Sequence, residues 1–232
     1  MNWIKRNLSL IILLAFVVAT IVTGYIYYLS DDKSQKLGNF LGGCFTGLLI
    51  ATIEYLITLD ERSKLDKIKA LKIKEVLFNR AEESYYRNLI RGAKINIHIM
   101  GVTAVRFLQD FAQADSNSSD KKVLFDALNR NVEVRILLPE KIILKNENDL
   151  SNFDISLAIM KKIHDLYPSK FNYRYFNHEP AHSIFNIDDE TIIGPVIPNL
   201  SSKDTPGIHV LNSSKYAKTF LEYFQKEWDG AK

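Results

Sequence analysis

LSLIILLAFVVATIVTGYIYYL (residues 8–29) and LGNFLGGCFTGLLIATIEYLITL (residues 37–59) are the two stretches that decide the architecture of this chain. Each exceeds the roughly 20 apolar residues that a helix needs to cross about 30 Å of hydrocarbon. The residues between them, 30–36, are polar and too few to form a domain. The sequence therefore predicts a transmembrane hairpin over residues 1–59.

Basic residues at the ends of the two spans predict the orientation of the hairpin. Lysine and arginine close to a span are retained in the cytoplasm. Lys5 and Arg6 precede the first span, six basic residues follow the second within residues 62–74, and the loop holds only Lys33 and Lys36. We expect a two-pass protein with both termini in the cytoplasm. A cleaved signal peptide is the alternative interpretation of residues 1–30, but the apolar run is longer than a usual h-region and no A-x-A site follows it.

Four glycines in the second span indicate close helix packing. They form two small-xxx-small pairs, a spacing that lets helix backbones approach each other in lipid: Gly38 with Gly42, and Gly43 with Gly47. Two interpretations remain open. The hairpin packs on itself, with Thr20 and Gly24 of the first span as partners, or the span assembles with other copies of the chain.

Glu54 places a carboxylate inside the second span, close to its cytoplasmic end. A charge at this depth is costly unless it reaches the interface, pairs with another group or faces water. Glu54 therefore either extends to the interface near Asp60 and Arg62, or forms an interhelical or pore-facing carboxylate.

Composition limits what the rest of the chain can be. Beyond the hairpin, roughly 170 of the 232 residues remain, enough for one domain of ordinary size. The net charge of +3 comes largely from the lysines next to the membrane. Cys44 is the only cysteine and lies in a span, so no intramolecular disulfide is possible. We expect no metal, because Pro180 separates His178 from His182 and no ligand pattern supports them, and no cofactor, because no phosphate-binding glycine loop is present.

The remainder divides into a helical stalk over residues 60–89 and an α/β domain over residues 90–232. Residues 60–89 contain neither glycine nor proline and are rich in helix formers, which predicts one continuous helix. Its C-terminal part is alternatively the first helix of the domain. Periodicity then predicts strands at 94–101, 132–138, 171–176, 183–187 and 191–196, and helices at 102–113, 121–130, 149–166 and 213–228. The first strand, helix and strand form a parallel βαβ unit and hence an α/β sheet.

The run from His182 to Asp189, HSIFNIDD, followed by Ile192-Ile193-Gly194, resembles one copy of the phospholipase D motif, H-x-K-x4-D and then G-S-x-N. The order of elements over residues 75–232 is also similar to one half of that fold. The resemblance implies that His182 occupies the position of the nucleophile and Asp189 that of the motif aspartate. It also implies a ligand pocket containing His182, Asn186 and Asp189.

Two departures from the motif argue against catalysis. Ile184 stands where the family has the lysine that binds phosphate, and Gly-Pro-Val-Ile (194–197) stands where it has G-S-x-N. Phosphoryl transfer depends on positioning and on stabilising charge, so both losses should remove most of the rate. The family combines two motifs and this chain has one, so an active site would also require a homodimer. We expect a domain that binds rather than one that cleaves.

A two-span hairpin joined to one small domain resembles the membrane effectors of bacterial anti-phage systems of the retron or cyclic-nucleotide type. The resemblance implies an inner-membrane protein in antiviral defence whose domain senses a nucleotide, nucleic-acid or protein trigger encoded nearby. Its hairpin would then oligomerise in the lipid bilayer, disrupt it and cause growth arrest or abortive infection. The alternatives are a membrane-tethered phosphodiesterase or nuclease that acts as a dimer through His182, and a non-catalytic membrane adaptor. Basic and aromatic residues also mix over residues 161–175, as on nucleic-acid surfaces, although an ordinary helix-to-strand surface has the same composition.

Overall fold

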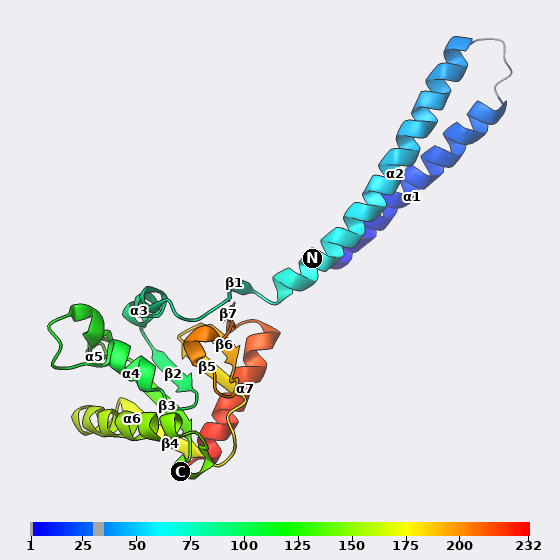
Figure 1. Cartoon of the computed structure of the whole chain (residues 1–232). Helices are drawn as coiled ribbons and strands as arrows, with labels where there is room; N and C mark the ends of the chain where they lie inside the picture. Colours follow the sequence, from blue (N-terminus) through cyan, green and yellow to red (C-terminus); the bar gives the residue numbers. More distant parts are fainter. Residues whose placement is uncertain (1, 30–34) are drawn as a thin grey trace. The chain divides into compact units, whose positions relative to one another are not determined.

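The computed structural model describes residues 2–29 and 35–232, and for residues 2–10, 35–38, 59–60 and 62–63 it describes the backbone alone. The chain forms two compact units, Met1–Lys69 and Ala70–Lys232 (Figure 1). Residues 30–34 of the predicted polar loop lie outside the described residues.

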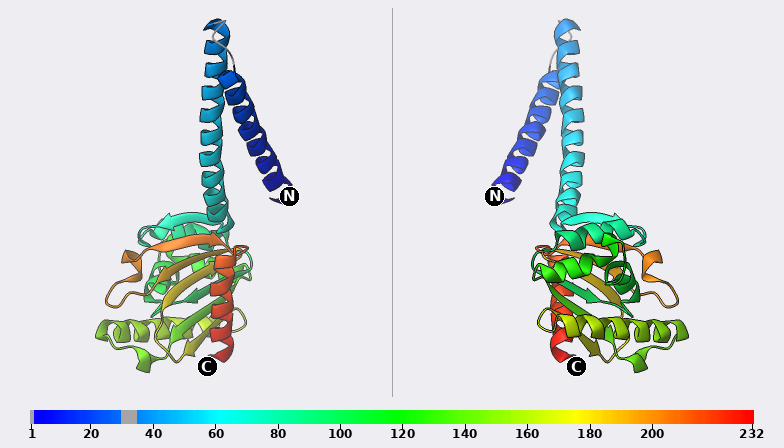
Figure 2. Two further views of the ribbon diagram at one scale, coloured as in Figure 1. Left: turned by 90° about the vertical axis from the view of Figure 1, so that its right-hand side faces the viewer. Right: turned by 90° about the vertical axis from the view of Figure 1, so that its left-hand side faces the viewer.

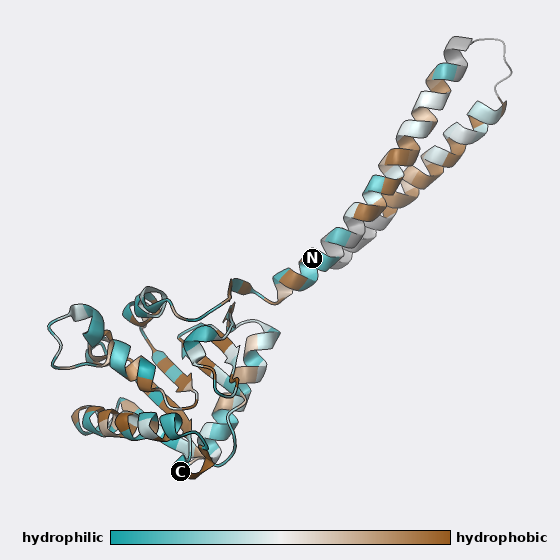
Figure 3. Cartoon of the chain, in the orientation of Figure 1, coloured by the Kyte–Doolittle hydropathy of each residue, from teal (hydrophilic) through white to brown (hydrophobic). Residues whose placement is uncertain are grey.

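The first unit consists of α1 (Asn2–Leu29) and most of α2 (Gln35–Ala70). Within them, Ile11–Leu29 and Asn39–Thr58 are long and apolar enough to cross a membrane. Hydrophobic residues run along both helices in Figure 3. The two apolar helices that the sequence predicts are therefore present.

Small and polar side chains bring α1 and α2 together. The hydroxyl oxygens of Thr20 and Thr52 lie 3.3 Å apart across the two helices, and each hydroxyl also donates to a carbonyl of its own helix. A Cβ atom on Gly24 would lie only 2.8 Å from the ring of Phe45. Because Gly24 has no side chain, that ring can lie directly against the backbone of α1.

The continuous helix predicted over residues 60–89 is not formed. α2 ends at Ala70, Lys72 takes a positive φ of 50°, and an edge strand, β1 (Ile73–Leu77), follows. β1 pairs antiparallel with β7 (Gly207–Leu211) near the other end of the chain. The helix resumes only as α3 (Glu83–Gly92), the first helix of the domain. Pairing with β7, which the sequence analysis did not predict, outweighs the local helix propensity.

The second unit contains one seven-stranded sheet in the order β1-β7-β6-β5-β2-β3-β4. β2 (Asn96–Met100), β3 (Glu133–Pro139) and β4 (Phe171–Phe176) are parallel to one another. β5 (His182–Ile187) pairs antiparallel with β2, and β6 (Glu190–Pro195) pairs antiparallel with β5. The predicted βαβ unit is confirmed by the parallel pairing of β2 and β3, but the sheet as a whole is mixed.

Helices cover both faces of this sheet (Figures 1 and 2). One face packs against α3, α4 (Val105–Phe111), α5 (Val123–Asn129) and α6 (Glu147–Leu166), and this interface holds the largest cluster of buried apolar residues. The other face carries only α7 (Lys215–Gly230), through Phe224 and Trp228. Short 3-10 helices lie at Ser119–Lys122, Lys141–Ile143 and Ser202–Asp204. The result is a three-layer α/β unit.

Candidate functional site

His182 begins β5 and lies beside the aromatic side chains of α7. Its ring meets Phe220 edge to face, with centroids 5.2 Å apart, and Tyr223 at 6.5 Å. Within the described part of the chain, no hydrogen bond or ion pair involves its imidazole. The structure thus gives His182 aromatic neighbours and neither a carboxylate to orient it nor a cation beside it.

Ile184, at the position of the motif lysine, belongs to the hydrophobic core. It is 1% exposed and packs among Met100, Leu137, Phe224 and Trp228 beneath α7. A lysine ammonium at this position would be enclosed by apolar groups and unpaired. The Ile184 side chain therefore fills the position of the motif lysine with hydrophobic packing.

Asn186 and the acidic turn after β5 have structural partners. The amide of Asn186 donates to the carbonyl of Glu190 and to the hydroxyl of Thr191, both at 3.0 Å. The carboxylate of Asp188 accepts three backbone N–H bonds from residues 94–96, at 2.9 to 3.0 Å. Asp189 has an exposed side chain. Asp188 thus stabilises this turn, whereas Asp189, the motif aspartate of the resemblance, lies with its side chain in solvent.

The three residues predicted to share a ligand pocket are not brought together. His182 and Asn186 are four positions apart on one strand, which corresponds to about 13 Å at roughly 3.3 Å per residue, and Asp189 lies beyond the strand in the turn. His182 faces α7, Asn186 is 3% exposed within its hydrogen bonds, and Asp189 faces solvent.

Arg80 occupies the space beside Gly194, the motif glycine. A Cβ atom on Gly194 would lie 2.7 Å from Cζ of Arg80 and 2.7 Å from the carbonyl oxygen of Pro206. Gly207, on the next strand, likewise leaves room for the Arg80 stem. The two glycines form a trough across β6 and β7 that holds the arginine side chain.

The Arg80 guanidinium is 7% exposed and bonds only to neutral groups among the described residues. Its donors reach the hydroxyls of Ser183 and Thr205 and the carbonyls of Thr205 and Pro195. Burial lowers its pKa, the nearby Tyr86 partly opposes this, and Arg106 adds to it. Arg80 fixes the segment between β1 and α3 to the sheet, a role that the sequence did not indicate.

A chain of titratable side chains links β1, β6, β7 and α3. Lys74 pairs with one oxygen of the Glu190 carboxylate, and Nε2 of the buried His209 lies 3.0 Å from the other, within ion-pair distance but not aligned as a hydrogen bond. The Tyr85 hydroxyl lies 2.6 Å from Nδ1 of His209. Burial lowers the pKa of His209, although Glu190 opposes it, and burial together with Glu75 raises the pKa of Tyr85. Lys74 thus links β1 to β6, and the Tyr85–His209 contact links α3 to β7.

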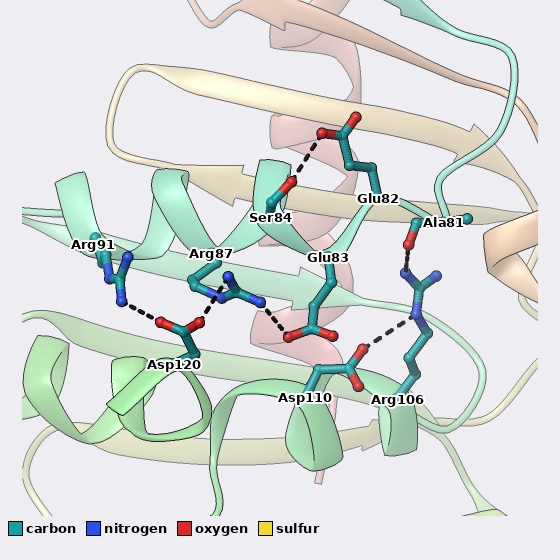
Figure 4. A network of polar contacts seen from close by, with 9 residues as sticks. All are labelled: Ala81, Glu82, Glu83, Ser84, Arg87, Arg91, Arg106, Asp110 and Asp120. Atoms are coloured by element: carbon teal, nitrogen blue, oxygen red, sulfur yellow. Dashed lines mark hydrogen bonds and ion pairs between the residues drawn. The ribbon is translucent and has the colours of Figure 1, made fainter. Parts of the chain in front are cut away.

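Arginine–carboxylate pairs fasten α3 to its neighbours (Figure 4). Arg87 lies 2.6 Å from Glu83 and 3.0 Å from Asp120, which also accepts from Arg91 at 2.5 Å. Arg106 of α4 contacts Asp110 at 3.3 Å and donates to the carbonyl of Ala81 at 3.0 Å. These side chains are partly exposed, so each pair contributes little alone. Together they position α3 above the sheet.

The glycines of α2 have two different surroundings. A Cβ atom on Gly42 would lie 3.4 Å from the Tyr27 ring of α1, so Gly42 serves packing within the hairpin. A Cβ atom on Gly43 or Gly47 would have no atom of the described residues within 4 Å. The Glu54 side chain is exposed on α2, and the surroundings of Gly38 lie outside the described side chains. Among the described glycines of α2, Gly42 therefore contacts α1 and Gly43 and Gly47 do not.

No group of three or more His, Cys, Asp or Glu residues that could hold a metal ion occurs in the described part of the chain. His178 contacts Glu227 at 2.9 Å instead. The neighbouring Glu179 carbonyl and this carboxylate raise the pKa of His178.

No protein-family model and no curated protein matches the chain. Among solved structures, the chain is similar to TrmBL2, an archaeal chromatin protein whose structure shows a novel mode of DNA binding. The TM-score is 0.46 and the sequence identity is 14%, and the likeness covers 83% of this chain and 69% of TrmBL2. The chain is also similar to NucT from Helicobacter pylori, with a TM-score of 0.41 and 13% identity over 64% of this chain and 87% of that one.

Proposed function

We propose that this chain is a two-pass inner-membrane effector, with both termini in the cytoplasm, whose hairpin assembles with other copies and disrupts the bilayer. The α/β unit would be its cytoplasmic sensor, a non-catalytic domain resembling one half of the phospholipase D fold. Its trigger is a ligand or partner encoded nearby, and the outcome is growth arrest in anti-phage defence.

The observation that supports assembly is the open side of α2. Gly43 and Gly47 form a small-xxx-small pair with no atom of the described residues within 4 Å of a Cβ position, while Gly24 and Gly42 serve the contact between α1 and α2. Among the described residues, the packing of the hairpin therefore does not involve the Gly43/Gly47 pair. A second α2 helix can approach closely along this side.

The surroundings of the motif residues support a sensor over an enzyme. His182 lies against aromatic rings, Ile184 is in the core, and Arg80 occupies the space above Gly194. Arg80 is the cation among them, and its guanidinium donates to Ser183, Thr205 and Pro195.

Propidium uptake in bacteria that express the full chain tests this proposal. We expect the wild type to admit the dye and to form cross-linked oligomers, and the Gly43→Leu/Gly47→Leu variant to lose both. The matched control is Gly43→Ala/Gly47→Ala, because alanine still permits close helix approach. Equal dye uptake and cross-linking in the leucine variant would refute assembly through this side of α2.

His182→Ala separates the enzyme alternative from the effector. Dye uptake that survives this substitution and requires residues 1–59 supports the effector. Growth arrest with intact membranes that is lost in His182→Ala supports a phosphodiesterase or nuclease instead. If the expressed protein forms no cross-linked oligomers and the cells take up no dye, the result supports the adaptor.

A further inference from the structure

A cavity of about 450 Å³ lies between α6 and the edge strand β4, away from His182. It is lined by residues of α6, β4 and the segment after β3: Glu140, Lys141, Phe153, Leu157, Lys161, Tyr173 and Tyr175. Its size falls within the range of small-molecule sites. Glu140 and Lys141 directly follow the carboxyl end of the parallel strand β3, and this edge of an α/β sheet is where ligands commonly bind.

Aromatic rings form the walls of this cavity. The rings of Phe153 and Tyr175 are 5.6 Å apart, and those of Tyr173 and Tyr175 are 5.8 Å apart and nearly perpendicular. Leu157 adds an aliphatic surface from α6. Walls of this composition suit a flat ring system, which can stack on one ring and meet the edge of another.

The Tyr175 hydroxyl is a polar group without a partner. It is buried, and within the described part of the chain it makes no hydrogen bond. Burial raises the pKa of Tyr175 to about 12, so the hydroxyl keeps its proton at neutral pH and can donate it. A buried hydroxyl without a partner costs free energy. Its oxygen has less than 1 Å² of accessible surface, so a ligand atom that accepts from it would do so after the side chains around Tyr175 shift, and would remove that cost.

Two opposite charges at the cavity are also unpaired among the described residues. Lys161 and Glu140 take part in no ion pair, whereas the Lys141 ammonium is held by the Asp154 carboxylate at 2.6 and 2.7 Å. Lys161 can therefore bind an anionic group and Glu140 can accept from an N–H donor. A ligand that uses both carries a negative charge and an amino group on one ring system.

We propose that this cavity binds a nucleotide whose base carries an exocyclic amino group. The base would lie among Phe153, Tyr173 and Tyr175, its amino group would donate to Glu140, and its phosphate would pair with Lys161. Carboxylates accept from base amino groups in the same way when proteins read cytosine, and bases stack on aromatic side chains irrespective of sequence. The inference deepens the proposed function, since it names the class of ligand that the sensor domain would recognise.

Calorimetric titration of the full chain in lipid nanodiscs tests the proposal, with AMP, CMP, UMP and adenosine as the probes. We expect AMP and CMP to bind with a dissociation constant below about 1 mM. UMP, which lacks the amino group, and adenosine, which lacks the phosphate, should each bind several-fold more weakly. Absence of binding by all four compounds would overturn the proposal.

Single substitutions assign the contacts. Lys161→Gln should weaken AMP binding about tenfold, and Lys162→Gln is the matched control, because Lys162 is the next residue of α6 and does not line the cavity. Tyr175→Phe should weaken AMP binding about threefold while leaving the thermal stability of the ligand-free protein unchanged or higher. Equal AMP affinity in all these proteins would exclude this cavity as the site.

The same variants keep the two proposals separate. If nucleotides fail to bind but dye uptake still depends on Gly43 and Gly47, the effector stands and the nucleotide is excluded as its ligand. If nucleotides bind as described but the glycine variants leak like the wild type, the cavity stands and the assembly mechanism fails.

Discussion

His98 of β2 should make the second unit sensitive to mild acid. Its ring stacks on Phe224 of α7 at a centroid distance of 5.2 Å and an interplanar angle of 1°. Its Nε2 atom is buried and has no hydrogen-bond partner among the described residues. Burial, with a smaller contribution from Arg135, lowers the pKa of His98 to about 4. The folded protein thus holds this imidazole neutral.

The direction in which stability changes with pH follows from the pKa of His98 in the folded and in the unfolded protein. In the unfolded chain His98 titrates near its ordinary pKa of about 6.5, so between pH 6.5 and 4 the unfolded state binds more protons than the folded state. The contribution of His98 to stability is complete above pH 6.5 and is lost as the pH falls toward 4. A pKa difference of about 2.5 units removes about 2 kcal/mol between pH 7.5 and pH 5, and about 3.4 kcal/mol in total.

Urea unfolding of the full chain in detergent, followed by tryptophan fluorescence, measures this loss. The sequence has two tryptophans, Trp3 and Trp228, and Trp228 is 6% exposed in the core beneath α7. A Trp3→Phe background leaves only Trp228 to report. The free energy of unfolding is then extrapolated to zero urea at pH 7.5 and at pH 5.

His98→Gln is the control that isolates this residue. Other groups with shifted pKa values, such as His209 and Asp110, contribute alike to both proteins and cancel in the comparison. We expect the wild type to lose about 2 kcal/mol more than His98→Gln between the two pH values. Equal losses would refute the reasoning from burial.

Three further substitutions test the motif strand and its neighbours. Gly194→Ala should lower the free energy of unfolding by about 2 kcal/mol, because the new Cβ atom would clash with Arg80 and with the backbone of Pro206. Gly92→Ala should not destabilise the protein, because a Cβ atom there has open space. Thermal unfolding of the two variants measures this difference. Asp188→Ala should cost about 2 to 3 kcal/mol by removing three backbone hydrogen bonds to a carboxylate, and Asp189→Ala should be neutral in urea unfolding. Restoring the motif lysine as Ile184→Lys should yield unfolded protein by circular dichroism, since it buries an unpaired charge; a folded variant would contradict this.

Elements with strong local patterns could be predicted from the sequence. The two apolar helices, the closing helix α7 and the strands from β2 to β6 lie within a few residues of their predicted positions. Their patterns are local, because alternation or helical spacing indicates which face of each element is buried.

β1 and β7 could not be predicted in the same way. β1 is an exposed edge strand in a segment rich in lysine and glutamate, so its sequence is typical of a helix. Its strand character depends on pairing with residues 207–210, and β7 lies among glycine, proline and serine residues that indicate a loop. Both segments form strands because they pair with each other over a long sequence separation. A local sequence pattern contains no information about such pairing.

The site was predicted less well than the fold. The motif resemblance located β5 and its turn, but it could not indicate that Arg80 fills the space at Gly194 or that Asp188 takes the structural role. Nor could it indicate that His209 and Tyr85, more than a hundred residues apart, come within hydrogen-bond distance. The mixture of basic and aromatic residues at 161–175 includes Lys161, Tyr173 and Tyr175 of the cavity beside β4, but it indicated no cavity, and only the structure brings Glu140 and Phe153 to it.

The pairing of β1 with β7 also determines the order in which the protein can fold during synthesis. β1 leaves the ribosome about 130 residues before its partner, which at 5 to 20 residues per second is roughly 7 to 26 s. Throughout this interval the chain next to the hairpin carries a strand with no partner. This segment carries charged side chains at Lys72, Lys74 and Glu75. Such charges disfavour the pairing of an unpaired edge strand with a neighbouring nascent chain.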